Sequence, residues 1–322
     1  MKEIIGFKQI IEKEIQNIDF PTLPNNLYDP IKYILSLKAK RIRSVALLIA
    51  HQLYNKEYKN ALDAALAIEM FHNFTLIHDD IMDNASLRRG SPTVHEKWNE
   101  NIAILSGDTL LVKSYMMLIN LDTKIQTQVL KKFSETAAIV CEGQQMDMDF
   151  EKQEHLNIED YIKMIEKKTS VLFASAFEIG ALIGGADKSD QNLIYQFGLN
   201  LGIAFQLQDD LLDLYADQSK FGKRAGGDII ANKKTFLYLK SLSLAHPKQK
   251  EDLQNLYSSL DFNQSNKIKK VKSIFDSLNV YESTLETIKN YHNHALDSLK
   301  KINVKNKSSL NYFVDLLVKR EV

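Results

Sequence analysis

Residues 74–83, Phe-Thr-Leu-Ile-His-Asp-Asp-Ile-Met-Asp, end a long amphipathic stretch that contains no helix breaker. A second, similar stretch ends with residues 203–213, Ile-Ala-Phe-Gln-Leu-Gln-Asp-Asp-Leu-Leu-Asp. Side chains four residues apart share one face of a helix, so Asp79 and Asp83 can point two carboxylates in one direction. In the second cluster, Asp209 and Asp213 can do the same. The apolar residues before each cluster predict that both helices lie in the core of the protein.

Carboxylates crowded on one helix face repel one another unless a cation lies between them. Oxygen ligands favour Mg²⁺, which commonly binds through one or two carboxylates and the phosphates of a substrate. A single cluster of this kind is most often the solvated end of an exposed helix. Two copies in apolar surroundings instead indicate a functional pair, because buried like charges need a compensating ligand. Two such clusters facing each other would hold a diphosphate.

The whole chain is typical of a nearly all-helical protein. Only 5 prolines and 12 glycines interrupt 322 residues, and apolar residues recur at three- and four-residue spacing almost throughout. No linker rich in Pro, Gly or Ser divides the chain, so residues 1–322 are expected to form one domain. The expected helices are 2–18, 27–37, 41–56, 60–83, 99–120, 124–148, 158–184, 189–216, 232–245, 248–260, 265–277, 281–301 and 306–319. Residues 221–228, with three glycines and two cations, are expected to form a mobile basic lid.

Composition limits the classes of function. The chain has 41 basic and 41 acidic residues, which argues against a nucleic-acid-binding surface over the whole protein. The single cysteine, Cys141, excludes an intrachain disulfide framework and is expected to fill the core. Residues 1–6 lack the apolar core of a signal peptide, and no apolar run approaches the roughly 20 residues that span a bilayer. We therefore expect a soluble, cytoplasmic protein.

Two groups of basic residues accompany the aspartates. One expected helix start is crowded by Lys38, Lys40, Arg41 and Arg43, and Arg88 and Arg89 follow the first acidic cluster. Arginine presents a planar fork that grips phosphate bidentately, and lysine serves as a point charge. Either group alone is ordinarily a solvated surface. Beside metal-binding carboxylates, both become candidate phosphate clamps.

Several motifs, in order along the chain, resemble those of the trans-isoprenyl diphosphate synthases, also called polyprenyl synthetases. They are Lys40-Arg41-Ile42-Arg43, His72 with residues 76–83, residues 88–95, Gly107-Asp108, residues 143–147, Lys168-Thr169, residues 205–213, and Gly226-Gly227-Asp228 with residues 232–235. The resemblance covers nearly the whole chain, and so many motifs in one order are highly specific. It implies an all-α helical bundle of the isoprenoid synthase type with a central active-site cavity, usually as a homodimer.

The resemblance also implies an activity, the head-to-tail elongation of an isoprenoid chain. An allylic diphosphate (dimethylallyl, geranyl or farnesyl) ionises, and the double bond of isopentenyl diphosphate captures the carbocation. Loss of a proton then gives a longer all-trans allylic diphosphate. Ionisation requires that the charge developing on the diphosphate be stabilised, which metal ions and Lys or Arg can do. No protein base is evident, and the released diphosphate is the expected proton acceptor.

The resemblance assigns roles position by position. The residues expected to hold Mg²⁺, as three ions with substrate bound, are Asp79, Asp83 and Asp209, supported by Asp80, Asp210 and Asp213. The residues expected to bind isopentenyl diphosphate are Lys40, Arg43, His72 and Arg89. Those expected to bind the allylic diphosphate are Arg88, Lys168, Lys223 and Lys233. Those expected to offer oxygen dipoles near the developing cation are Thr169 and Gln206.

Plainer interpretations exist for several of these residues. His72 on an apolar helix face can be an ordinary core histidine, Lys168 can pair with Glu166 on the surface, and Gln206 can bond a neighbouring helix. The chain also departs from the family in one place. Where the family commonly has two glycines and, further on, a proline, this chain has Lys38-Ala39 and Ser44. The departure affects the expected geometry of Lys40.

The resemblance also raises the question of how long the isoprenoid product is. The product of this family grows down an apolar tunnel beneath the first acidic helix. Phe74, five residues before Asp79, is expected to close the tunnel, and Phe71, one turn further down, is expected to be either floor or ordinary core. Thr75 is small, and no two-residue insertion interrupts the first cluster. This combination favours geranylgeranyl diphosphate as product, with a farnesyl or longer-chain product as the alternative.

Three other functions remain open. A terpene cyclase uses the same fold but needs neither a second DDxxD cluster nor cations for a second diphosphate. A catalytically inactive partner subunit is expected to lose aspartates, and this chain keeps all six. A metal-dependent phosphohydrolase built around His78-Asp79 leaves the second cluster unexplained.

Overall fold

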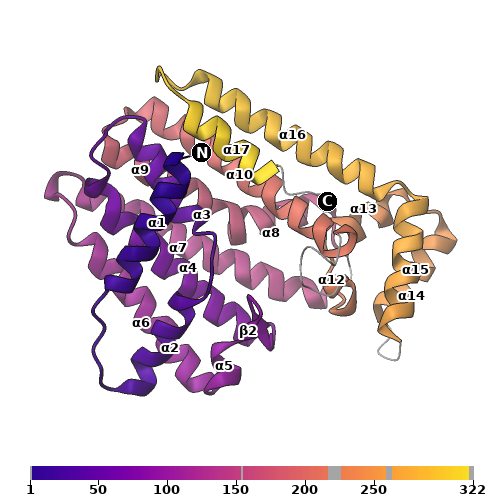
Figure 1. Ribbon diagram of the computed structural model, residues 1–322. Helices are drawn as coiled ribbons and strands as arrows, with labels where there is room; N and C mark the ends of the chain where they lie inside the picture. The colour runs from indigo at the N-terminus through magenta and orange to yellow at the C-terminus, as the bar shows by residue number, and fades with distance from the viewer. Residues whose placement is uncertain (1, 154, 217–225, 259–262, 319–322) are drawn as a thin grey trace. The chain divides into compact units, whose positions relative to one another are not determined.

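The computed structural model describes residues 2–153, 155–216, 226–258 and 263–318. Nearly all regular structure in this part of the chain is helical, which confirms the predicted all-α class (Figure 1). The helices are α1 (Lys2–Asn17), α2 (Asn25–Ser36), α3 (Ile42–Gln52), η1 (Tyr58–Ala61), α4 (Leu62–Met82), α5 (Val94–Lys97), α6 (Glu100–Leu118), α7 (Thr123–Lys152), α8 (Ile158–Ile165), η2 (Glu166–Ser170), α9 (Val171–Gly184), α10 (Lys188–Tyr215), α12 (Gly227–Ile230), α13 (Phe236–Leu244), α14 (Pro247–Ser258), α15 (Gln264–Ser277), α16 (Val280–Lys301) and α17 (Ser308–Val318). The described strands are β1 (Leu87–Arg88) and β2 (Ser91–Pro92).

The chain divides into two compact units, which are described separately. Unit 1 comprises Met1–Thr136, Ser175–Tyr195 and Ile302–Phe313, and unit 2 comprises Ala137–Ala174, Gln196–Lys301 and Val314–Val322. Helices α7, α9, α10 and α17 contribute residues to both units. The single domain predicted for residues 1–322 stays a prediction.

Helix α4 forms the centre of unit 1. Its 21 residues include neither glycine nor proline, and every residue from Ala64 to Phe71 is buried. Burial on all sides is typical of a helix enclosed by its neighbours. Within unit 1, α4 packs against α1, α3 and α6, and its contact with α6 runs along much of its length (Figure 1). The first acidic cluster therefore ends a core helix, as predicted.

Close packing of the helices in unit 1 depends on glycine. A Cβ atom on Gly180 of α9 would lie 2.1 Å from the carbonyl oxygen of Leu47 in α3. A Cβ atom on Gly107 of α6 would lie 2.5 Å from Nε2 of His78 in α4. Protein interiors are already close-packed, so a larger residue at position 180 forces the backbones of α9 and α3 apart, and one at position 107 displaces the ring of His78.

A tight hairpin follows α4. Strands β1 and β2 pair antiparallel with Arg88 opposite Ser91. The two residues between them, Arg89 and Gly90, have φ angles of 56° and 77°. Two consecutive residues with positive φ are the signature of the type I′ turn that joins two-residue hairpins. The sequence gives no strand signal here, because each strand is only two residues long.

Unit 2 has a core of its own. It includes Tyr161 of α8, Phe236 of α13, Tyr257 of α14 and Phe275 of α15, together with the apolar residues that precede the second acidic cluster in α10. Helices α14 and α15 lie side by side, and α13 packs against α15 and α16 (Figure 1). The second acidic cluster thus also lies near the end of a core helix.

Most expected helices agree with the observed ones to within a few residues, and the differences have local causes. The expected helix 158–184 contains one turn of π-helix, η2, between α8 and α9. The prediction that Cys141 fills the core is wrong: Cys141 is exposed, because it lies on the outer face of α7 one turn before the exposed Gln145. Residues 221–225 of the expected lid lie outside the described residues, and Lys223 is among them.

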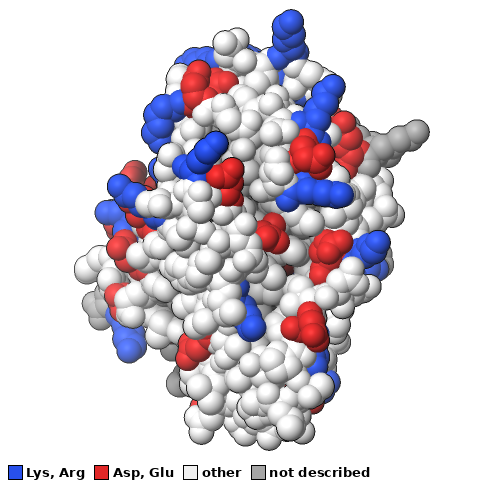
Figure 2. Space-filling view, turned by 90° about the vertical axis from the view of Figure 1, so that its left-hand side faces the viewer, with Lys and Arg blue, Asp and Glu red and all other residues white. Residues whose placement is uncertain are grey.

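The surface carries charges of both signs. Figure 2 shows Lys and Arg side chains interspersed with Asp and Glu side chains over one face of the protein. This mixing matches the equal numbers of basic and acidic residues in the sequence. None of the described helices is long and apolar enough to cross a membrane.

We expect Gly180→Ala to destabilise the protein by about 1–3 kcal/mol, the usual cost of overpacking. The added Cβ meets a backbone carbonyl, which cannot rotate away. Gly6→Ala is the matched control, because nothing lies within 4 Å of a Cβ at this position in α1. It should stabilise by about 0.5–1 kcal/mol through helix propensity. Urea unfolding followed by circular dichroism measures both, and a wild-type midpoint for Gly180→Ala would contradict the close-packing argument.

Candidate active site

The first acidic cluster lies where α4 ends. Asp79 is partly exposed and Asp83, the first residue after the helix, is exposed, whereas Asp80 is only 1 % exposed. Neighbouring residues of a helix point in different directions, while residues four apart share a face. Asp80 therefore turns into the protein, and the outer two aspartates keep access to solvent.

Asp80 is held by Arg88 of the hairpin. Nε of Arg88 donates to both carboxylate oxygens, at 2.9 and 3.1 Å, and Nη2 donates to Oδ1 at 2.5 Å. Burial raises the pKa of Asp80, and the hydrogen bonds and charge of Arg88 oppose that rise. Bidentate pairing of this kind is among the strongest polar contacts in proteins. Arg88, predicted to bind the allylic diphosphate, thus already uses two of its nitrogens to fix the first cluster.

A buried ion pair joins the start of α3 to α4. Nη1 of Arg41 donates to Oε1 of Glu69 at 2.7 Å, and Nη2 donates to the carbonyl oxygen of Leu35 at 2.6 Å. The hydroxyl of Ser44 donates to the other carboxylate oxygen of Glu69 at 2.6 Å. Arg41 has a φ of 53°, a left-handed conformation that non-glycine residues seldom adopt. Ser44, one of the departures from the family pattern, therefore completes the network that holds this conformation.

Arg43, which lies between Arg41 and Ser44 in the sequence, contacts His72 of α4. Nη1 of Arg43 lies 3.3 Å from Nε2 of His72. Because a guanidinium can only donate, Nε2 accepts and the ring is neutral. Burial holds the pKa of His72 well below its ordinary value, and the charges of Arg43 and Arg89 lower it further. These three predicted residues are thus close enough to interact in unit 1, and Lys40 is exposed nearby in the sequence.

The two predicted floor residues belong to an aromatic group. The ring centroid of Phe74 lies 5.5 Å from that of Phe71 and 4.7 Å from that of His78. Phe71 in turn lies 5.3 Å from Phe133. Phe71 is 1 % exposed and Phe74 is 8 % exposed. Both are packed side chains, and their role in closing a tunnel stays a prediction.

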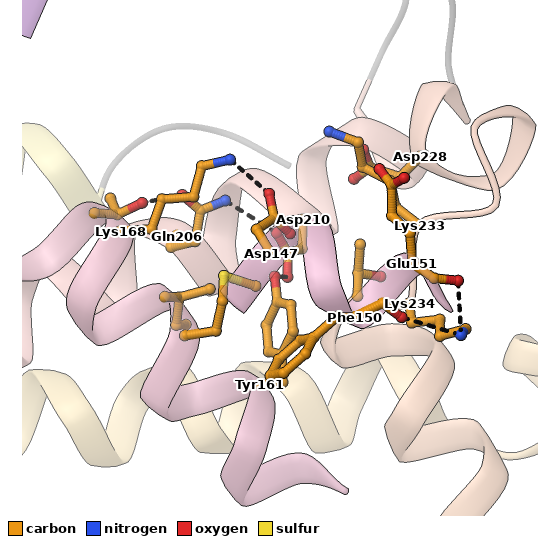
Figure 3. A pocket seen from close by; sticks show the side chains of 14 residues that line it. Asp147, Phe150, Glu151, Tyr161, Lys168, Gln206, Asp210, Asp228, Lys233 and Lys234 are labelled. Atoms are coloured by element: carbon orange, nitrogen blue, oxygen red, sulfur yellow. Dashed lines mark hydrogen bonds and ion pairs between the residues drawn. The ribbon is translucent and has the colours of Figure 1, made fainter. Parts of the chain in front are cut away.

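The second acidic cluster repeats the arrangement in unit 2. Asp210 is 4 % exposed, whereas Asp209 is partly exposed. The hydroxyl of Tyr161 donates to Oδ2 of Asp210 at 2.5 Å, and the amide of Gln206 donates to Oδ1 at 3.1 Å (Figure 3). Burial, with the nearby charge of Asp228, holds the pKa of Asp210 well above its usual range against these two hydrogen bonds. The middle aspartate is again bonded inward.

Asp213, the last residue of this cluster, supports the chain that follows. The backbone N–H of Asp228 donates to Oδ2 of Asp213 at 3.0 Å, and the N–H of Gly226 donates to its carbonyl oxygen at 2.8 Å. A Cβ on Gly227 would lie 3.1 Å from Oδ1 of Asp213. The Gly-Gly-Asp motif is therefore shaped to lie directly against this aspartate.

Lys168 and Thr169 both come from the π turn η2. Nζ of Lys168 lies 2.5 Å from Oδ2 of Asp147 in α7, so its ion pair is with α7 rather than with Glu166 on its own helix. The hydroxyl of Thr169 donates to Oε1 of Gln206 at 3.2 Å. Gln206 thus bonds a neighbouring helical segment, as its plainer interpretation proposed, and links Thr169 to the second cluster.

These side chains surround a cavity of about 130 Å³ in unit 2 (Figure 3). The lining residues are Asp147, Phe150, Glu151, Tyr161, Met164, Ile165, Lys168, Thr169, Gln206, Asp210, Asp228, Lys233, Lys234 and Thr235. Lys233 extends beside Asp228, whereas the ammonium of Lys234 donates to the carbonyl oxygens of Phe150 and Glu151 at 3.1 and 3.3 Å. The cavity therefore combines carboxylates, ammonium groups and neutral oxygen atoms in a small volume.

The outer aspartates have the chemistry that Mg²⁺ requires. Mg²⁺ is a hard cation that prefers oxygen and commonly takes one or two protein carboxylates, with water and substrate phosphates completing its shell. In the described part of the chain, no three His, Cys, Asp or Glu side chains gather closely enough to hold a metal by themselves. Asp79 and Asp83 in one cluster and Asp209 in the other fit an ion that shares its ligands with a substrate.

Sequence reasoning gave no role to Glu69, Asp147, Tyr161 or Asp228. Asp147 and Asp228 stand in the quoted motifs, so a signal was present for them. Glu69 also had a signal, because an acidic residue on the buried face of a core helix needs a buried partner. Tyr161 had none: its partner Asp210 is 49 residues away, and only the fold brings them together.

The comparisons with known proteins agree with this geometry. The polyprenyl synthetase family matches residues 24–277. The geranylgeranyl diphosphate synthase of Methanosarcina mazei is 42 % identical over 221 residues, 68 % of each chain, and that of Sulfolobus acidocaldarius is 35 % identical over 99 % of this chain and 97 % of its own. A crystal structure of geranylgeranyl pyrophosphate synthase matches with a TM-score of 0.94 and 40 % identity over 99 % of both chains.

The helical fold and the paired acidic clusters define a trans-prenyltransferase. The chain belongs to the polyprenyl synthetase family, as its motifs predicted. Enzymes of this family use isoprenyl diphosphates as substrates.

Glu69→Ala should destabilise the protein by about 3–5 kcal/mol, because it leaves the Arg41 guanidinium buried without its counter-charge. Glu12→Ala, which breaks a half-exposed pair with Lys8 in α1, is the control and should change stability by at most about 1 kcal/mol. Urea unfolding followed by tryptophan fluorescence compares the two. Equal, small losses would mean that the Arg41–Glu69 pair is not what holds α3 to α4.

Proposed function

We propose that this enzyme condenses isopentenyl diphosphate with an allylic diphosphate and releases a short all-trans polyprenyl diphosphate. The observation that carries the proposal is the shared design of the two acidic clusters. In each, the middle aspartate is bonded inward, Asp80 to Arg88 and Asp210 to Tyr161. The outer aspartates Asp79, Asp83 and Asp209 keep some exposure to solvent, and we propose that they share cations with the phosphates of the substrate.

We assign Mg²⁺ to Asp79, Asp83 and Asp209, as three ions when substrate is bound. Bound there, Mg²⁺ supplies positive charge that stabilises the departing diphosphate. The chain's own contribution is to orient these carboxylates, and the bonds to Asp80 and Asp210 fix each helix end for that purpose. Asp213 holds the Gly-Gly-Asp motif, which brings the carboxylate of Asp228 to the cavity.

The cations divide between the two substrates. For isopentenyl diphosphate we assign Lys40, Arg43, His72 and Arg89. For the allylic diphosphate we assign Arg88, Lys168, Lys223 and Lys233, with Thr169 and Gln206 beside the developing cation. Lys168 and Lys233 line one cavity with Thr169, which supports this grouping. The released diphosphate takes the proton that is lost after condensation.

For the product we propose geranylgeranyl diphosphate, with a farnesyl or longer-chain product as the alternative. The ring of Phe74 contacts those of Phe71 and His78, and we assign it to the floor of the product tunnel. The relatives named above carry the name geranylgeranyl diphosphate synthase, which supports the same length.

We further propose a homodimer. Helix α6 and the residue after it carry a row of exposed apolar side chains, Leu105, Val112, Met116 and Ile119, which are 59, 58, 50 and 60 % exposed. Their spacing of seven, four and three residues places them on one helix face. A contiguous apolar face of this kind is typical of a protein–protein contact. The cytoplasmic location stays a prediction.

The direct test is incubation with isopentenyl diphosphate, Mg²⁺ and each labelled allylic diphosphate in turn. Elongated products, analysed by chromatography after dephosphorylation, support the proposal. Cyclic hydrocarbons would indicate a terpene cyclase, phosphate release alone would indicate a phosphohydrolase, and no reaction would indicate an inactive partner subunit. Chelation of the metal should abolish elongation, and added Mg²⁺ should restore it.

Asp79→Ala and Asp209→Ala should each abolish turnover while the protein stays folded, because each removes a metal ligand and relieves charge repulsion. The expected loss in kcat/KM corresponds to several kcal/mol, in the order of other metal-centred charge stabilisation. Asp122→Ala, at an exposed position before α7, is a control that should leave turnover unchanged. Near-normal turnover in either cluster variant would overturn the metal assignment.

Phe74→Ala should lengthen the product while activity persists, because an isoprenyl tail can occupy the space that the ring leaves. The same change in a closed core costs about 3–5 kcal/mol, and we expect a milder loss if the ring borders a tunnel. Chromatography of dephosphorylated products from wild type, Phe74→Ala and Phe71→Ala measures the effect. An unchanged length distribution with retained activity would show that Phe74 is core rather than floor.

A further inference from the structure

The π turn η2 lies against α7 without any side chain between the two backbones. A Cβ on Gly143 of α7 would lie 2.2 Å from the backbone nitrogen of Lys168 and 2.6 Å from its Cα. Real Cβ atoms do not come this close to other atoms, so only glycine fits. The obstruction is backbone on a helical turn, which cannot move aside as the end of a flexible side chain can.

Two ion pairs flank this contact. Nζ of Lys167 lies 2.5 Å from Oε2 of Glu142, and Nζ of Lys168 lies 2.5 Å from Oδ2 of Asp147. Glu142 and Asp147 stand on either side of Gly143 in α7. In this stretch of α7, each of two carboxylates pairs with one of two consecutive lysines of the turn. Between the two carboxylates, the glycine lets the backbone of α7 contact the backbone of the turn.

The π turn is also held from within and from a second neighbour. The N–H of Val171 donates to the carbonyl oxygen of Glu166, five residues earlier, and the hydroxyl of Ser170 donates to that of Ile165 at 3.3 Å. A Cβ on Gly202 of α10 would lie 2.8 Å from Cα of Ser170. Single π turns are rare, occur frequently at functional sites and need such support. Here the turn carries Lys168 and Thr169, which both line the cavity.

Lys167 differs from Lys168 in one respect. Lys168 lines the cavity, whereas Lys167 does not and bonds the exposed Glu142 instead. Its pair with Glu142 is therefore expected to affect the cavity through the position of the turn rather than through contact with a substrate. This distinction separates a positioning effect from direct contact with a substrate.

We propose that Gly143, together with the Glu142–Lys167 pair, is a positioning element for the allylic diphosphate. It sets the distance between α7 and η2, so that the ammonium of Lys168 and the hydroxyl of Thr169 keep fixed places in the cavity. This inference rests on the proposed function. It concerns the allylic substrate, because Lys168 and Thr169, the residues that the turn places in the cavity, are assigned to that substrate.

The test compares Gly143→Ala with wild type and with Gly6→Ala, in which an added Cβ meets nothing within 4 Å. Gly143→Ala should raise KM for the allylic diphosphate at least tenfold and lower kcat, with KM for isopentenyl diphosphate changed less than twofold. Amide hydrogen exchange in residues 166–171 should become faster. Gly6→Ala should match wild type in all of these measurements.

If Gly143→Ala does not fold, Lys167→Met decides the question. It should raise KM for the allylic diphosphate about threefold, and Lys167→Arg, which keeps the ion pair, should restore the wild-type value. Lys300→Met is the matched control, because it breaks an exposed pair with Asp297 in α16. The positioning role would be overturned if KM rose equally for both substrates in either test variant. It would also be overturned if neither test variant raised KM for the allylic diphosphate.

The experiment separates this inference from the proposed function. If wild type does not elongate any allylic diphosphate, the proposed function fails, and the hydrogen exchange of residues 166–171 still reports whether Gly143 holds the turn. If wild type elongates and Gly143→Ala binds and turns over both substrates normally, the positioning inference alone is wrong.

Discussion

The constraint on which this protein depends is the burial of a carboxylate in the middle of each acidic cluster. A buried carboxyl group is tolerated only where hydrogen bonds or opposite charge replace the lost water. Asp80 accepts hydrogen bonds from two nitrogens of Arg88, in the hairpin after α4. Asp210 accepts hydrogen bonds from a hydroxyl of α8 and an amide of α10. These bonds anchor the last turns of two core helices. The outer aspartates are carried on these anchored turns, and Asp79 and Asp209 stay partly exposed.

The same logic extends to the basic groups. Arg41 adopts an unfavourable left-handed conformation at the start of α3, and Glu69 with Ser44 compensates for it. The hairpin also places a non-glycine residue, Arg89, at positive φ. Both strained arginines sit beside residues assigned to phosphate binding. In each case buried polar bonds or a short hairpin hold an arrangement that the local backbone does not favour by itself.

The helical class, the core position of both acidic clusters and the family could be predicted from the sequence, because long apolar periodicity and ordered motifs are local signals. The partners of Asp80 and Asp210 could not be predicted. Arg88 reaches Asp80 through a hairpin whose strands are too short to leave a pattern, and Tyr161 reaches Asp210 only through the packing of α8 on α10. The π turn was also missed, because apolar spacing continues through residues 158–184. Cys141 was misplaced since a small, apolar residue type says nothing about which face of α7 it occupies.

The hydrogen bond from Thr169 to Gln206 fixes the direction in which the threonine hydroxyl is polarised. Its proton is committed to Oε1 of Gln206, whose own amide is committed to Asp210. The lone pairs of the hydroxyl oxygen are what remain for the cavity that Thr169 lines. At the place that we propose for the carbocation, this oxygen would present a partial negative charge, and because it keeps its proton it is a poor nucleophile. This part of the wall can steady a positive charge without forming a bond to it.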